Sequence, residues 1–171
     1  MKKLFALMLT LCLLLSCTAV LAEAAEDTMS GSYVDLDKIG MKIFIFDSMV
    51  EDPDAEPGES AELLYAWKDA EGADDYFKIE AVDLSEAGIA TAEAFLSAVQ
   101  ATGKADSAEL VTLENGLQVV LVSSAEEDEI CASIVYDNGL VLGFTVGPIA
   151  GQEENASTVL GYLMGTLLPL E

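Results

Sequence analysis

Apolar and polar residues alternate along seven blocks of this chain, and each block predicts a β-strand. A two-residue period places successive side chains on opposite faces of a sheet, so each strand has one apolar face. In one block Phe77 and Ile79 face one way. Tyr76 and Lys78 face the other way. The predicted strands span residues 41–47, 63–68, 76–82, 109–114, 117–123, 129–136 and 140–147.

Two segments have the 3.6-residue period of helices instead. Residues 91–102 carry an apolar stripe that starts after Thr91, a suitable N-cap, and ends before Gly103, a suitable C-cap. Residues 152–168 carry a second stripe, which Pro169 should terminate. Each helix is apolar on one side only, which suits packing against a sheet.

The turns between strands complete the predicted topology. Asn115-Gly116 and Asn138-Gly139 are typical of tight two-residue hairpins, in which both central residues have positive φ. The acidic stretch 69–75 joins the second and third strands in a longer hairpin. The order of elements predicts an α+β fold, in which a single antiparallel sheet is flanked by helices in an α/β/α sandwich.

The first residues predict export. Lys2 and Lys3 precede an apolar run over residues 4–15, and small residues close the segment at Ala22 and Ala24. This is the layout of a secretory signal peptide over residues 1–24, with cleavage after Ala22 or Ala24. Residues 25–38 are polar and are expected to form a flexible leader, and residues 39–171 are expected to form one α+β domain.

An alternative for the same segment is a lipid anchor. The sequence Leu14-Leu15-Ser16-Cys17 is similar to a bacterial lipobox, which would acylate Cys17 and hold the protein at the cell surface. The residues after Cys17 remain apolar, however, whereas lipoproteins usually become polar there. We therefore favour a released protein over a lipoprotein. No later stretch is long and apolar enough to span a membrane.

Composition narrows the function classes. The chain has 31 acidic residues, seven lysines, no arginine and no histidine, giving a formal charge of −24. Nucleic acids and anionic lipids need clustered cations, so neither is an expected partner. The absence of histidine excludes imidazole metal sites and histidine-based triads. With 52% hydrophobic residues in patterned blocks, the chain is a folded domain and not a disordered acidic tail.

The order of elements resembles the PsbP-like family. The resemblance is carried by the opening Ile39-Gly40-Met41-Lys42-Ile43, the hairpin around Asn115-Gly116, the strand 140–146 and the closing amphipathic helix. This family is an α/β/α sandwich found in a photosystem II extrinsic subunit, a yeast Ran-binding factor and exported bacterial proteins. No photosystem or Ran-binding motif is matched. The resemblance therefore implies a binding or accessory domain without chemistry of its own.

Three functional hypotheses follow. The favoured one is a secreted, acidic, non-enzymatic domain, without a cofactor, that binds an unknown protein or cell-surface partner. Its candidate contact residues are Trp67 and Tyr76, if these are exposed; burial in the core is the expected alternative. A second hypothesis is an extracellular calcium-binding module, and a third, disfavoured one is a carboxylate-based hydrolase. The candidate calcium ligands are Asp69, Glu71, Asp74 and Asp75.

Overall fold

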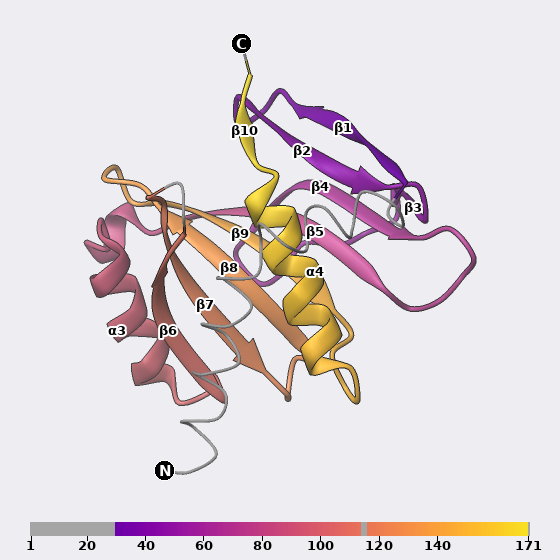
Figure 1. Ribbon diagram of the computed structural model, residues 1–171. Coiled ribbons are helices and arrows are strands. Elements are labelled where there is room, and N and C mark those ends of the chain that lie inside the picture. Colours follow the sequence, from indigo (N-terminus) through magenta and orange to yellow (C-terminus); the bar gives the residue numbers. More distant parts are fainter. Residues whose placement is uncertain (1–29, 114–115, 171) are drawn as a thin grey trace.

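The computed structural model describes residues 30–113 and 116–170, which form two antiparallel sheets and two α-helices (Figure 1). The signal peptide predicted over residues 1–24 lies outside the described residues. The elements are, in chain order, β1 (Gly31–Leu36), β2 (Met41–Phe46), β3 (Met49–Glu51), β4 (Glu62–Asp69), β5 (Tyr76–Asp83), η1 (Ser85–Ala87), α3 (Ala92–Thr102), β6 (Ser107–Thr112), β7 (Gln118–Ser124), β8 (Glu129–Val135), β9 (Leu140–Gly147), α4 (Glu153–Gly165) and β10 (Leu168–Pro169).

The larger sheet has seven strands in the order β3-β4-β5-β9-β8-β7-β6. All seven strands predicted from the sequence are confirmed to within about two residues, and six of them lie in this sheet. The alternation of side chains works as expected: Phe77 is fully buried and pairs with Val146 of β9, while its neighbour Lys78 pairs with Thr145 on the opposite face.

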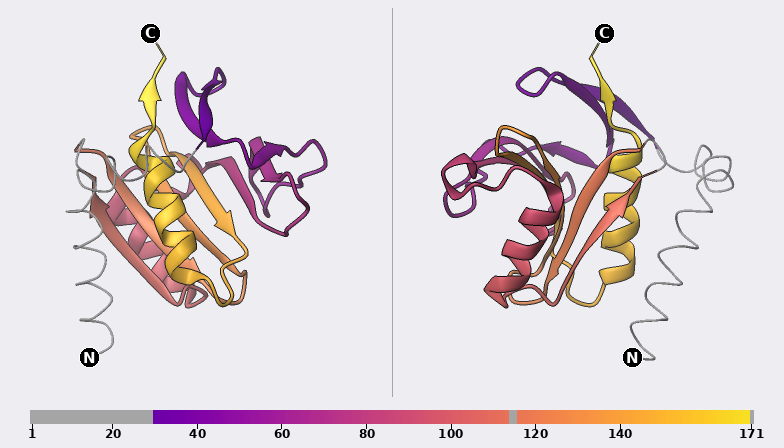
Figure 2. Two further views of the ribbon diagram at one scale, coloured as in Figure 1. Left: turned by 45° about the vertical axis from the view of Figure 1, so that its right-hand side comes forward. Right: turned by 90° about the vertical axis from the view of Figure 1, so that its left-hand side faces the viewer.

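The two helices cover opposite faces of this sheet (Figure 2). α3 packs against β6, β7 and β8, whereas α4 packs against β8, β9 and β2. The Thr91 hydroxyl accepts a hydrogen bond from the amide of Ala94, and Gly103 closes α3 with a φ of 66°. The predicted α/β/α sandwich is thus confirmed. No helix within the described residues is both long and apolar enough to cross a membrane.

A second, three-stranded sheet of order β1-β2-β10 corrects two expectations. The strands do not form a single sheet, and residues 31–36 of the predicted flexible leader form β1, paired with β2 from Gly31↔Phe46 to Leu36↔Met41. Leu36 is fully buried, so it anchors this strand in the core. Serines and aspartates around Leu36 made the stretch appear to be a linker, but an edge strand tolerates polar residues on its outer face.

The hairpin at Asn138-Gly139 also differs from its prediction. Only Gly139 has positive φ, at 86°. Its amide donates to the carbonyl of Tyr136, and the amide of Tyr136 donates to the carbonyl of Leu140. The connection is therefore a three-residue loop with one left-handed glycine, not a two-residue turn. Asn115 of the other predicted turn lies outside the described residues.

The core lies where the larger sheet, α4 and the smaller sheet meet. Ile43 and Ile45 of β2 enter it from one side, and Leu160 and Leu163 of α4 enter it from another. Helix α4 ends at Gly165, earlier than predicted, and the chain then extends so that Leu168 pairs with Lys42 of β2. The two sheets and the end of α4 are thereby joined into one hydrophobic cluster.

Candidate binding surface

Two acidic turns and the turn that leads into α4 meet at one end of the larger sheet. They are residues 69–75 between β4 and β5, residues 124–128 between β7 and β8, and residues 147–152 between β9 and α4. Strand pairing brings these turns together, because Tyr76 of β5 pairs with Gly147 of β9 and Ile130 of β8 pairs with Val146 of β9. We call this region the acidic end. Its carboxylates are Asp69, Glu71, Asp74, Asp75, Glu126, Glu127, Asp128, Glu153 and Glu154.

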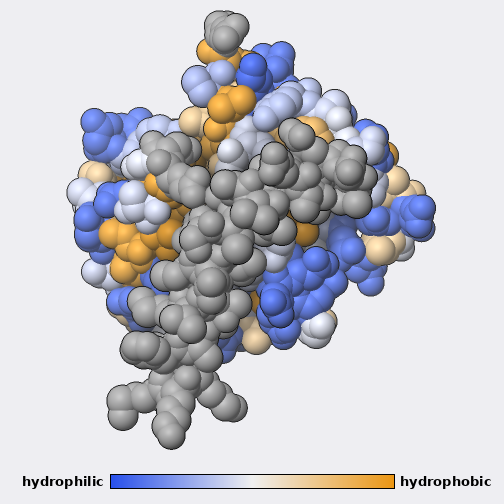
Figure 3. All heavy atoms as spheres, viewed as in Figure 1, coloured by the Kyte–Doolittle hydropathy of each residue, from blue (hydrophilic) through white to orange (hydrophobic). Residues whose placement is uncertain are grey.

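Side-chain hydrogen bonds tie the three turns to one another. The Asp128 carboxylate accepts from the amides of Ile149, at 2.9 Å, and Ala150, at 2.7 Å. The Gln152 side-chain amide donates to Asp75 Oδ1 at 2.9 Å. Some of the acidic residues therefore shape the loops, while the exposed ones leave a concentrated negative charge at the surface. In Figure 3, hydrophilic residues gather around the lower right, where α4 begins.

The four candidate calcium ligands have different roles in this region. Asp69 Oδ1 accepts from the backbone amides of Glu71 and Ala73, which closes the turn, and Asp75 contacts Gln152. Glu71 and Asp74 are exposed. Among the described residues, no three Asp, Glu or Cys side chains converge in a group that would hold a metal ion. Calcium binding stays a prediction.

Trp67 belongs to the core. It is 3% exposed, and its ring stacks between Tyr65 and Phe77 with centroid distances of 6.1 and 5.3 Å. The expectation of burial is correct for Trp67, and its use as a contact residue is wrong. Tyr76, the other candidate, is half-buried and lies at the edge of the acidic end, where its hydroxyl donates to Glu129 Oε1 at 2.5 Å.

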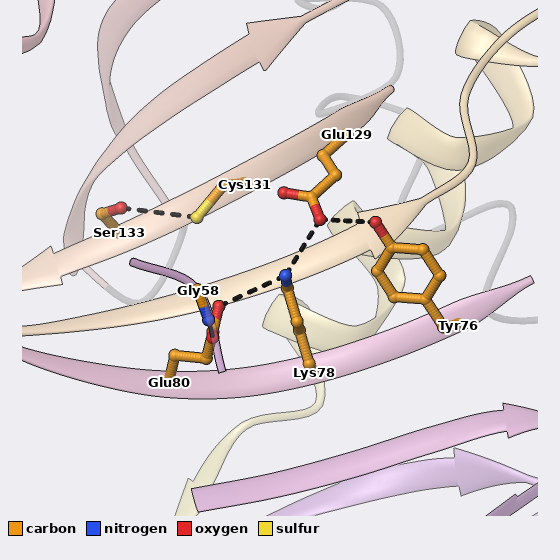
Figure 4. A network of polar contacts seen from close by, with 7 residues as sticks. All are labelled: Gly58, Tyr76, Lys78, Glu80, Glu129, Cys131 and Ser133. Atoms are coloured by element: carbon orange, nitrogen blue, oxygen red, sulfur yellow. Dashed lines mark hydrogen bonds and ion pairs between the residues drawn. The ribbon is translucent and has the colours of Figure 1, made fainter. Parts of the chain in front are cut away.

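Tyr76 also belongs to a polar network on the sheet face opposite α4 (Figure 4). Lys78 lies between two glutamates, with its Nζ at 2.9 Å from Glu129 Oε1 and 3.5 Å from Glu80 Oε2. Glu80 in turn accepts from the amide of Gly58 at 2.6 Å, which holds the acidic loop after β3 against this face. The network thus links strands β5 and β8 to a surface loop.

The pKa values of the groups in and beside this network suit a structural role. Burial would lower the pKa of Lys78, but the hydrogen bond and charge of Glu129 outweigh it, and the pKa is raised. Burial and Glu129 raise the pKa of Tyr76, and burial raises the pKa of the Cys131 thiol, which lies 3.5 Å from the Ser133 hydroxyl. A lysine held as ammonium and a thiol held protonated are poor nucleophiles.

Replacing Lys78 with methionine should lower the free energy of unfolding by about 2 kcal/mol, because two partly buried carboxylates lose their cation. Lys78→Arg should retain most of the stability. Since the folded-state pKa of Lys78 is raised, its contribution is present below the unfolded value of 10.5 and is lost only as the pH rises through the folded value. Urea unfolding at about pH 7 and about pH 9 should therefore show the same difference from the wild type. A difference that vanishes over this range would contradict the ion-pair role.

Beside the acidic end lies a cleft of about 140 Å³, between the smaller sheet, α4 and the β4–β5 hairpin. Its walls are mostly apolar and its polar groups come from the acidic end and from α4. The apolar lining is Phe46, Met49, Val146, Pro148, Ala156 and Val159, and the polar lining is Ser48, Asp69, Asp75, Gln152 and Asn155. Tyr76 and Gly147 complete the lining. Two of the candidate calcium ligands are thus brought together at this cleft, whereas Glu71 and Asp74 do not line it.

The fold is shared with solved structures of low sequence identity. The solution structure of cyanobacterial PsbP (CyanoP) from Synechocystis superposes with a TM-score of 0.53 at 13% identity, covering 82% of this chain and 93% of that one. The fold is PsbP-like. The Ran-binding protein Mog1p of Saccharomyces cerevisiae gives a TM-score of 0.49 at 12% identity, covering 84% of this chain and 97% of its own.

The PsbP-like resemblance inferred from the order of elements is therefore confirmed as a statement about fold. No protein-family model matches the sequence, and no curated protein sequence matches it. At such low identity the likeness transfers no site residue.

Proposed function

We propose that this chain is an exported, non-catalytic binding or accessory domain whose acidic end docks on a basic partner at the cell surface. The observation that carries the proposal is the convergence of two acidic turns and the acidic first turn of α4 at one end of the sheet. Asp128 and the pair of Asp75 and Gln152 hold them together. A dense negative surface attracts basic proteins and steers their approach.

A non-catalytic role is supported by the nature of the most connected polar groups. Lys78, Tyr76 and Cys131 all have raised pKa values, which makes them unsuited to nucleophilic or base chemistry at neutral pH. Asp69 and Asp75, the acids that a carboxylate-based hydrolase would use in the cleft, accept hydrogen bonds from turn amides and from the Gln152 side chain. The PsbP-like fold is compatible with an accessory role.

The charge of the acidic end is tested by a variant with glutamine at Glu126, Glu127, Glu153 and Glu154, all exposed. A matched control replaces Asp35, Asp37, Glu86 and Glu93, also exposed, with the corresponding amides and so removes the same charge elsewhere. The probe is a decapeptide of alternating lysine and serine, titrated at about 50 mM salt, where screening is weak. We expect about ten-fold weaker binding for the acidic-end variant and less than about three-fold for the control.

If both variants lose the same affinity for the decapeptide, only the net charge of the protein matters, and the proposed surface is rejected. Repeating the titration with millimolar calcium, and with magnesium at matched ionic strength, separates screening from a specific site. We expect the two ions to weaken peptide binding equally. Stronger competition by calcium alone would favour the calcium-binding module instead.

Export rests on residues 1–24, and the cell-surface location is part of the proposal. A released protein begins at Glu23 or Ala25 after cleavage. If Cys17 were acylated instead, the protein would begin at Cys17 and carry the mass of its lipid. The intact mass of the protein recovered from the producing cells and their medium distinguishes the two forms.

A further inference from the structure

We infer that the cleft beside the acidic end receives the long cationic side chain, lysine or arginine, of the partner protein. This inference rests on the proposed function and names the contact within it. Such a side chain combines an apolar stem with a charged tip, and it buries the stem along apolar surface while its tip bonds to polar groups. The cleft has the same division, with apolar walls and two aspartates among its polar groups.

The apolar walls are firmly positioned. Phe46 is stacked on Tyr162 of α4 with a centroid distance of 5.4 Å, so the smaller sheet and the helix hold this wall together. Met49 follows in β3, and Val159 lies three residues before Tyr162 on α4. These side chains suit the methylene groups of a lysine or arginine stem. They offer nothing to a hydrated calcium ion, which requires six or more oxygen ligands.

The two aspartates are oriented but not neutralised. One oxygen of Asp69 accepts from the Glu71 and Ala73 amides, and one oxygen of Asp75 accepts from Gln152. Within residues 30–113 and 116–170, Oδ2 of each has no protein donor. Both carboxylates therefore retain an oxygen that can accept from a cationic tip.

The lysines of the neighbouring strands β4 and β5 are already paired. Lys68 Nζ lies 2.7 Å from Asp52, and Lys78 bonds to Glu129 and Glu80. In the part of the chain that the structure describes, no ion pair reaches Asp69 or Asp75. The cleft thus has negative charge without an internal counter-ion, which is the complement of a basic side chain.

A protein is the favoured source of that side chain because the cleft continues into an aromatic patch. Phe46 contacts the edge of Phe44, with centroids 5.9 Å apart, and Phe44 contacts Tyr33 at 5.7 Å. Tyr33 is 50% exposed. Residues that flank the inserted lysine or arginine in an extended segment can cover these rings, as aromatic residues do in many protein interfaces.

The test uses blocked pentapeptides with lysine or arginine between paired glycines, and a third with norleucine, which has an uncharged stem. Binding is followed by the NMR signals of the Gln152 and Asn155 side-chain amides. We expect saturable shifts with at least one cationic peptide and none with the norleucine peptide at the same concentration. The double variant Asp69→Asn, Asp75→Asn should weaken binding by about five-fold or more. Asparagine keeps the acceptor oxygen, so both turns should persist.

The control variant Glu71→Gln, Asp74→Asn lies in the same turn and removes the same charge without touching the cleft lining. It should weaken binding by less than about two-fold. Equal weakening by both variants, equal shifts with norleucine, or no shifts at all would overturn the inference. If the Asp69, Asp75 variant binds the lysine-serine decapeptide normally while the four-glutamine variant does not, the acidic end stands and only the cleft is rejected. If neither variant affects the decapeptide, both proposals fail.

Discussion

Replacing Trp67 with alanine is expected to lower the free energy of unfolding by about 3–5 kcal/mol, the range for large aromatic side chains truncated in a core. The indole is almost completely buried and stacks on Phe77, which is fully buried itself. Its removal leaves a cavity in the core beside the rings of Tyr65 and Phe77. Urea unfolding followed by circular dichroism measures the loss.

Tyr33→Ala is the matched control for Trp67. Tyr33 also lies on a strand and contacts one aromatic ring, but half of it is exposed, so its loss should cost less than about 1 kcal/mol. Equal, small effects for both variants would place Trp67 on the surface, as expected of a partner-contact residue. A destabilised Trp67→Ala protein that still binds the basic peptides would confirm that its role is packing.

Starting the chain at residue 37 instead of residue 30 is expected to lower the unfolding free energy by about 3 kcal/mol or more. The deletion removes β1, and with it the fully buried Leu36 and the Tyr33 ring that packs against Phe44. It also leaves one edge of β2 without its backbone partners. The melting temperatures of the two versions measure the effect.

If the two versions of the chain melt at the same temperature, residues 31–36 contribute nothing to the stability of the fold, as the flexible-leader prediction requires. The deletion should have a second measurable effect, because it exposes one edge of β2. The shorter protein should self-associate more readily at high concentration, because an unpaired edge strand can pair with another copy. Sedimentation at two concentrations detects this difference.

Local sequence patterns predicted most of the helices and strands, because neighbouring residues in the chain determine where these elements form. The alternation around Phe77 and the capping of α3 by Thr91 and Gly103 depend on neighbours within a few residues. The hairpin across residues 69–75 was predicted for the same reason, because a polar turn separates two alternating blocks. These features carry over from sequence to structure without knowledge of the tertiary fold.

The elements that were missed depend on partners far away in the chain. β1 has a weak signal of its own and is held by Leu36 in a core formed mainly by later residues. The cleft combines Phe46, Asp75 and Val159, which no sequence window contains together. Periodicity also left open whether the Trp67 side of the sheet was covered. The second sheet, whose Ile43 and Ile45 belong to the same core cluster as Trp67, was not predicted.

β2 receives its two neighbours from opposite ends of the chain. β1 lies on one side of it, and Leu168 of β10 pairs with Lys42 on the other, while the Thr166 hydroxyl accepts from the amide of Phe44. During synthesis the second edge of β2 therefore stays unpaired until residues 166–169 have been made, more than 120 residues after β2 itself. A nascent chain, or one shortened before residue 166, would expose this edge of β2 beside the aromatic patch.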